Sequence, residues 1–105
     1  MAGNERRSEL IQVFQSCDPE TLRVIDRLLD EVVFLENRMS ELRRLPFLNV
    51  HPKRPELQKS TPAARQYKEC MQSYMNAIRI LCGILAKTEP SAQDELLKRL
   101  EEFSL

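Results

Sequence analysis

The stretch that most constrains the fold is residues 61–85, where apolar side chains recur at alternating steps of three and four. This spacing lines one face of a helix with a seam of the coiled-coil type. A second apolar row repeats every seven residues beside it, so the face is wider than one partner helix would cover. We therefore expect contact with a second copy of the chain, the alternative being that one chain buries the whole face. The predicted interface residues are Tyr67, Cys70, Met71, Tyr74, Ala77, Ile78, Leu81, Ile84 and Leu85.

Two local signals and the composition predict an all-α fold. The sequences DPE at 18–20 and STP at 60–62 each place a capping side chain before a proline at the first helical position. The chain has only two glycines among 105 residues, and 30% of its residues are charged, which is typical of helical bundles. We predict one helical domain over residues 1–105, built on an antiparallel hairpin of long helices at about 19–45 and 62–87.

Shorter elements complete this expected architecture. A polar, frayed start over residues 1–7 leads into a short helix at 8–16, and another short helix follows at 91–103. Gly83 lies inside the second long helix, where glycine costs roughly 1 kcal/mol relative to alanine, and we expect it to mark a close helix contact. Residues 46–60 contain three prolines and no usable period, so they predict an irregular, basic loop. Its apolar residues should pin it to the helices: Phe47, Leu48, Val50 and Leu57.

Charge is unevenly distributed although the formal net charge is zero. Residues 43–68 hold seven Lys and Arg against the single acid Glu56, and acidic segments flank them. Such a cluster can engage phosphates without reading a base sequence, or pair with the acidic part of another copy. The alternative is a set of solvated helix faces, in which Arg43 and Arg44 simply suit the negative end of a helix. The candidate DNA contacts are Arg43, Arg44, Lys53, Arg54, Lys59, Arg65 and Lys68.

The residues that carry catalysis in other proteins are scarce here. The only histidine, His51, has no acid partner fixed beside it, and no glycine-rich phosphate loop is present. The cysteines Cys17, Cys70 and Cys82 are far apart in the sequence and predict free thiols rather than a metal site. We therefore predict a protein without catalytic residues, metal or other cofactor. The chain shows neither an apolar leader nor a membrane span, which predicts a cytoplasmic location without membrane contact.

A resemblance to a known family rests on residues 19–85. The segment Thr61-Pro62-Ala63-Ala64, followed by Tyr67 and a long amphipathic helix, resembles the small subunit of phage terminase. The preceding helix, ending in LENRMSELRRLPF, and the following VHPKRPELQKS are similar to the middle of these proteins. Many members also carry an N-terminal helix-turn-helix domain, for which residues 1–17 are too short, so the resemblance does not extend to specific DNA reading.

The resemblance implies a non-enzymatic, oligomeric DNA-packaging component in a bacterial host. Such a protein forms rings, binds double-stranded phage DNA and regulates the ATPase and nuclease of the terminase large subunit. Carried over by position, Lys53, Arg54 and Lys59 would contact DNA. The alternative function is a helical protein-protein interaction module, a phage-encoded adaptor or inhibitor that binds no nucleic acid. That module would use an adaptable methionine surface formed by Met39, Met71 and Met75.

Overall fold

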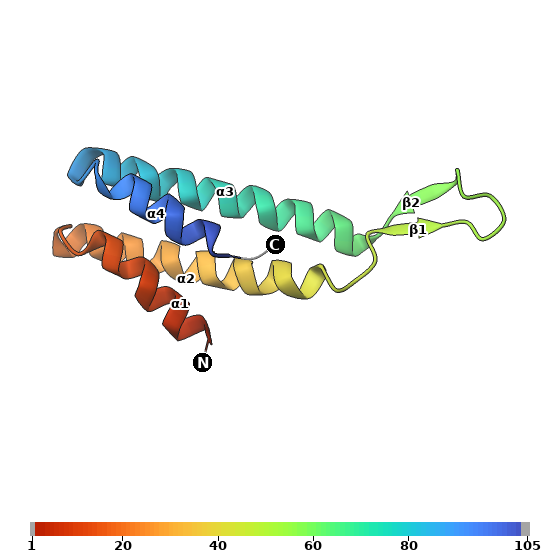
Figure 1. Cartoon of the computed structure of the whole chain (residues 1–105), viewed down its shortest axis with the longest axis horizontal. Coiled ribbons are helices and arrows are strands. Elements are labelled where there is room, and N and C mark those ends of the chain that lie inside the picture. Colours follow the sequence, from red (N-terminus) through yellow and green to blue (C-terminus); the bar gives the residue numbers. More distant parts are fainter. Residues whose placement is uncertain (1, 104–105) are drawn as a thin grey trace.

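The computed structural model describes residues 2–103, and it confirms the all-α fold with two long helices packed together. Helix α2 (Pro19–Leu42) and helix α3 (Pro62–Thr88) run antiparallel along the long axis of a molecule measuring 60 × 28 × 21 Å (Figure 1). Helices α1 (Ala2–Ile11) and α4 (Ala92–Glu101) pack beside one end of this pair, and the 3₁₀-helix η1 (Gln12–Phe14) follows α1.

Each long helix begins where its capping residue predicts. The Asp18 carboxylate accepts a hydrogen bond from the Thr21 amide at 2.7 Å, which satisfies an amide that has no partner inside α2. Hydrogen bonding to the Thr21 side chain, and then to its amide, lowers the pKa of Asp18. The Thr61 hydroxyl oxygen accepts from the Ala64 amide at 3.2 Å in the same way. Thr61 also donates to the carbonyl of Pro46 at 2.6 Å, and it is buried. This one side chain therefore starts α3 and ties it to the chain that leaves α2.

The other helix boundaries differ from the expected ones. Helix α2 ends at Leu42 rather than near residue 45, because the amide of Leu45 bonds to the carbonyl of Leu42 at 3.0 Å and tightens the last turn before Pro46. Helix α1 already spans Ala2–Ile11, so the expectation of a frayed segment is wrong for residues 2–7, while residue 1 lies outside the described residues. The last helix is shorter than 91–103.

The core lies where the four helices meet. Leucine, isoleucine and phenylalanine side chains from α1, η1, α2, α3 and α4 are fully buried there, which removes apolar surface from water and holds the short helices on the long pair. The completely buried side chains include Leu10, Phe14, Ile25, Leu29, Val32, Met39, Leu81, Leu85 and Leu96. None of the described helices is long and apolar enough to cross a membrane.

Gly83 does not mark a close helix contact. A methyl group built on its α-carbon would meet no atom within 4 Å, and the residue is exposed. The glycine therefore serves no packing purpose among the described residues, and the expectation drawn from the sequence is wrong at this position.

Candidate nucleic-acid interface

The segment expected to be an irregular loop is ordered as a small β-hairpin at its base. Strand β1 (Leu48–Val50) pairs antiparallel with β2 (Gln58–Ser60), with Leu48 opposite Ser60 and Val50 opposite Gln58. The hairpin extends beyond the ends of α2 and α3, away from the helical core (Figure 1). Three-residue strands are too short to show a period of two, which is why the sequence did not reveal them.

Most apolar residues of the hairpin do not pin it to the helices. Phe47 is the exception, since its ring lies 5.2 Å from the ring of Tyr67 on α3. Leu48, Val50 and Leu57 remain about half exposed, at 53%, 51% and 49%. Every residue from 48 to 60 is exposed. The hairpin therefore presents both of its edges and its apolar side chains to solvent, as an interaction element would.

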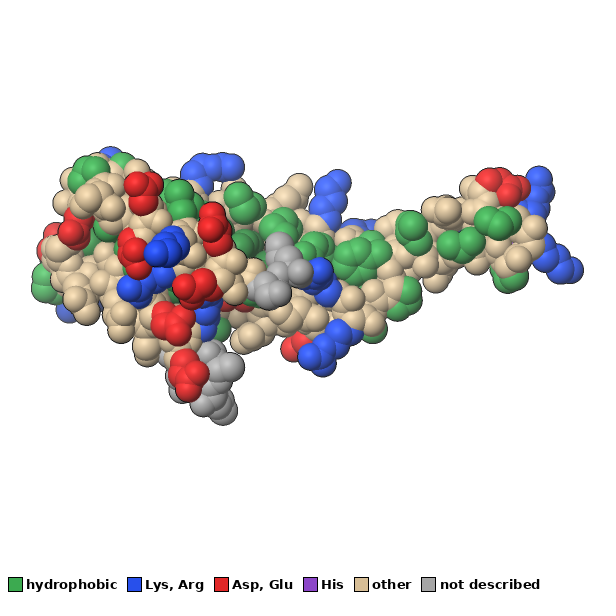
Figure 2. All heavy atoms as spheres, in the orientation of Figure 1, with side chains coloured by type: hydrophobic (Ala, Val, Ile, Leu, Met, Phe, Trp, Pro, Cys, Tyr) green, Lys and Arg blue, Asp and Glu red, His purple; other side chains and the backbone are tan. Residues whose placement is uncertain are grey.

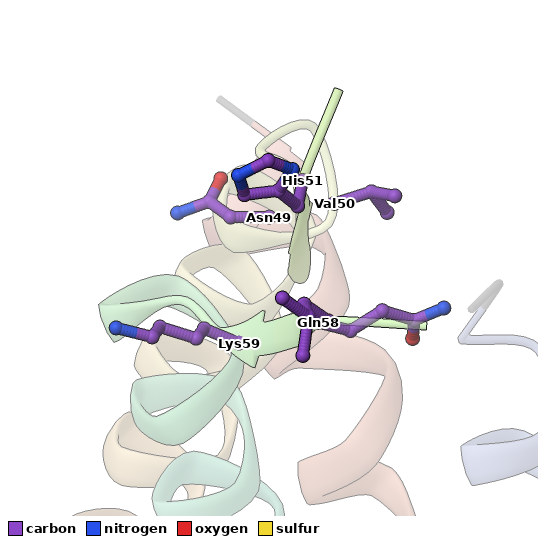
Figure 3. A pocket seen from close by; sticks show the side chains of 6 residues that line it. Asn49, Val50, His51, Gln58 and Lys59 are labelled. Carbon is purple, nitrogen blue, oxygen red and sulfur yellow. The ribbon is translucent and has the colours of Figure 1, made fainter. Parts of the chain in front are cut away.

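The two faces of the hairpin differ in chemistry. The side chains of Asn49 and Lys59 point to one side of the strands, whereas Val50 and Gln58 point to the other (Figure 3). This follows from the cross-strand pairing, because Asn49 lies opposite Lys59 and neighbouring residues alternate between faces. Together with His51 and Leu57 these four residues line an open pocket of about 450 Å³. One face thus carries a cation and an amide, whereas the other combines an aliphatic side chain with an amide.

The tip of the hairpin is held by its own hydrogen bonds. The His51 amide donates to the Leu57 carbonyl at 3.1 Å, and the Leu57 amide donates to the Arg54 carbonyl at 2.9 Å. The His51 side chain faces inward as well, because its Nδ1 accepts from the amides of Lys53 and Arg54 at 3.2 and 3.1 Å. Residues 51–57 therefore form a closed, hydrogen-bonded turn on an otherwise exposed hairpin.

The seven basic residues predicted to converge do not form one cluster. Lys53 and Arg54 lie at the tip, and Lys59 lies on β2. Arg43 and Arg44 follow the end of α2, while Arg65 and Lys68 lie in the first two turns of α3, at the base of the hairpin. Figure 2 shows the basic side chains at the tip set apart from those near the helices. The projection of the hairpin along the molecular axis causes this separation.

Although divided, the seven residues give one end of the molecule a strong positive charge. Residues 43–68 carry seven basic and one acidic side chain, and the rest of the chain carries nine basic and fifteen acidic ones, so the two parts have formal charges of +6 and −6. Within the described part of the chain, Arg54 is the only one of the seven paired with an acid, Glu56 at 3.2 Å. Both side chains of that pair are exposed, so its charges remain largely solvated.

Arg6 in the helical body has a different role, because it holds helices together. Arg6 on α1 donates two hydrogen bonds of 2.9 Å to Glu36 on α2 and one of 2.8 Å to the carbonyl of Arg99 on α4. The Tyr74 hydroxyl on α3 donates to Glu36 at 2.7 Å. The hydrogen bond with Glu36 raises the pKa of Arg6, and burial, followed by the same carboxylate, raises the pKa of Tyr74. This network joins all four α-helices.

The sequence did not reveal this network, because a glutamate such as Glu36 is normally expected on the exposed face of a helix. The residue is in fact 4% exposed. A signal was present, because Leu29, Val32, Glu36 and Met39 follow each other at steps of three, four and three. A carboxylate in an apolar row needs a buried partner, and Arg6 supplies it from a segment that looked frayed.

The predicted interface residues are largely covered by their own chain. Tyr74, Ala77, Leu81 and Leu85 are buried in the core. The other predicted residues are partly buried and pack against that core; they are Tyr67, Cys70, Met71, Ile78 and Ile84. The second apolar row, formed by Cys70, Ala77 and Ile84, therefore finds its partners within one molecule, where α3 packs against α2 and α4.

The apolar side chains that remain exposed lie elsewhere. Phe34 on α2 is 60% exposed, and Ile80 on α3 is 50% exposed. The methionine surface is incomplete, because Met39 is fully buried, whereas Met71 and Met75 line an open groove of about 380 Å³ on α3. Leu97 on α4 is also 45% exposed.

The cysteines are free thiols in the structure. Cys17 is buried with its sulfur 3.7 Å from the Thr88 hydroxyl, and Cys70 and Cys82 are partly buried. Burial raises the pKa of the Cys82 thiol, which favours its protonated and unreactive form. Among residues 2–103, no group of three His, Cys, Asp or Glu side chains is placed to hold a metal ion.

No protein-family model, curated protein or solved structure matches this chain. The features of the molecule that bear on its function are the hairpin, the charge separation and the exposed apolar side chains.

Proposed function

We propose that this protein is a non-enzymatic, self-associating DNA-packaging component of a bacteriophage, comparable in role to a terminase small subunit, acting in the cytoplasm of the host. The observation that carries the proposal is the separation of +6 and −6 formal charges, with the positive part on and around a projecting hairpin whose residues 48–60 are all exposed. Lys and Arg in such a position attract the phosphate backbone and release its counterions, which favours binding to DNA of any sequence. The terminase large subunit is the proposed protein partner.

Self-association is supported by two features of the helical body. Phe34 and Ile80 expose large apolar side chains on different long helices, and contact with another copy would remove them from water. The acidic body also complements the basic hairpin end of a neighbouring copy. We expect light scattering to give a mass several times the 12.3 kDa of one chain. A single species of monomer mass at micromolar concentration would rule out the oligomeric component that we propose.

DNA binding is best tested with a fluorescent duplex at two salt concentrations, about 50 and about 200 mM. We expect wild-type affinity to fall steeply with salt, and the variant Lys53/Arg54/Lys59→Glu to lose binding. The control variant Arg23/Arg27/Lys87→Glu makes the same charge change at three exposed residues of the helical body. It should lose much less affinity for the duplex. Absence of wild-type binding, or equal losses in both variants, would contradict contact through the hairpin.

A second function is favoured by the apolar side chains on the same hairpin. Leu48, Val50 and Leu57 are half exposed beside two unpaired strand edges, which suits an extended peptide added as a third strand. Under this proposal the protein is an adaptor or inhibitor that binds another protein and no nucleic acid. DNA retention that is absent, or that survives Lys53/Arg54/Lys59→Glu, would support it.

A further inference from the structure

His51 is the residue around which the exposed tip is organised. Its Nδ1 accepts two amide hydrogens, from Lys53 at 3.2 Å and from Arg54 at 3.1 Å. A ring nitrogen that accepts a hydrogen bond carries no proton, so in the neutral imidazole the proton lies on Nε2. The two nitrogens point in diverging directions from the ring, and the Nε2–H is therefore directed away from the backbone that Nδ1 caps.

The two capped residues are also the two cations of the tip. Pro52 and Pro55 flank them, and each proline restricts the backbone at its own position and at the residue before it. The Arg54 carbonyl accepts from the Leu57 amide at 2.9 Å, so residue 54 is held through both its amide and its carbonyl. The main chain that carries Lys53 and Arg54 is thus held in place on a segment whose residues are all exposed.

We propose that residues 51–54 form a phosphate-binding site at the hairpin tip, with His51 as its positioning residue. Nδ1 holds the backbone of Lys53 and Arg54 so that their cationic groups approach one phosphodiester group together. That group replaces Glu56 beside the Arg54 guanidinium, where the present ion pair of 3.2 Å is exposed and therefore weak. Nε2–H donates a hydrogen bond to an oxygen of that same group. The site rests on the proposed function, because the ligand is the phosphate backbone of double-stranded DNA, and it explains why an exposed tip is ordered by a side chain.

The positioning role of His51 predicts a different mutational effect from a role in which His51 only adds charge. If His51 acted only through the net charge of the tip, a lysine at this position would strengthen DNA binding. If it acts as a hydrogen-bond acceptor, a lysine removes the acceptor and releases the tip, since an ammonium group accepts no hydrogen bond. Asparagine provides the matched rescue, because its side-chain oxygen accepts from amides two and three residues ahead in turns.

The binding experiment compares wild type with His51→Asn, His51→Ala and His51→Lys on the same fluorescent duplex. We expect His51→Asn, which keeps the acceptor for the two amides but loses the Nε2–H donor, to bind on the order of fivefold more weakly than wild type, as the loss of about one net hydrogen bond implies. His51→Ala loses both roles and should bind on the order of fivefold more weakly again. His51→Lys should also bind more weakly than wild type despite its added charge. Binding by His51→Lys as tight as that of wild type would overturn the positioning role.

A spectroscopic measurement separates this inference from the proposed function. Nitrogen-15 NMR should report the imidazole proton on Nε2 rather than on Nδ1. The Lys53 and Arg54 amides should exchange more slowly in wild type and His51→Asn than in His51→Ala. A proton on Nδ1, in a wild type that binds DNA, would overturn the site and leave the proposed function intact. A wild type with the expected tautomer that binds no DNA would overturn both.

Discussion

The sharpest test of the structure is Glu36→Gln in the buried network. The substitution keeps the shape of the side chain and an oxygen that Tyr74 can still donate to, but it removes the negative charge opposite Arg6. The Arg6 side chain is only 15% exposed and would be left without its partner. Because Arg6 lies on α1 and also reaches the Arg99 carbonyl, the loss should loosen α1 and α4 together.

The expected loss in the free energy of unfolding follows from the geometry of this ion pair. Removing one member of a buried ion pair commonly costs about 3 to 5 kcal/mol, because the remaining charge stays desolvated. Arg6 retains its bond to the Arg99 carbonyl and some contact with water, so we expect a loss near the lower limit, about 3 kcal/mol. For a domain of this size that corresponds to a fall in melting temperature of about 12 to 24 °C.

Urea unfolding followed by circular dichroism measures this free energy. Glu41→Gln is the matched control, because Glu41 lies on the same helix in an exposed pair with Arg38 and should cost less than about 1 kcal/mol. The double variant Arg6→Met/Glu36→Met should be less destabilised than the sum of its single variants, since it leaves no buried charge unpaired. A Glu36→Gln cost below about 1 kcal/mol, or strictly additive effects, would refute the reasoning.

Three further predictions concern single positions. In a Tyr67→Phe background, absorbance titration should show Tyr74 ionising well above the usual tyrosine range, because its pKa is raised in the folded state. The stability that Tyr74 contributes should therefore be complete below about pH 10 and be lost above it. Thr61→Val should cost about 1 to 2 kcal/mol in urea unfolding, since it removes both the cap of α3 and the bond to the Pro46 carbonyl, and an unchanged midpoint would argue against this double role. Gly83→Ala should raise the stability by up to about 1 kcal/mol, because its methyl group meets open space; a loss of oligomeric mass on this substitution would instead place Gly83 in a contact between copies.

Several features of the fold could be predicted because their causes are local. Asp18 and Thr61 cap the long helices through residues only three positions away, and the prolines after them fit the first helical position. The apolar spacing of α2 and α3 likewise depends on neighbours within two turns of the same helix. These signals placed both long helices and their antiparallel arrangement correctly.

Other features could not be predicted, because they depend on residues that are distant in the sequence. Glu36 resembles a surface residue until Arg6, thirty positions earlier, is brought beside it. The hairpin likewise depends on pairing across its turn. Strands of three residues are too short for the sequence to indicate this pairing.

The sequence by itself thus determined the helical hairpin, the free thiols and the uneven distribution of charge, because capping, periodicity and composition are properties of nearby residues. Only the tertiary structure decided which charges are buried and which remain available. Packing of the four helices draws Arg6 and Glu36 into the core, while the projection of the hairpin carries Lys53, Arg54 and Lys59 into solvent. Burial depends on all the elements that surround a residue, and the sequence gives no direct measure of it.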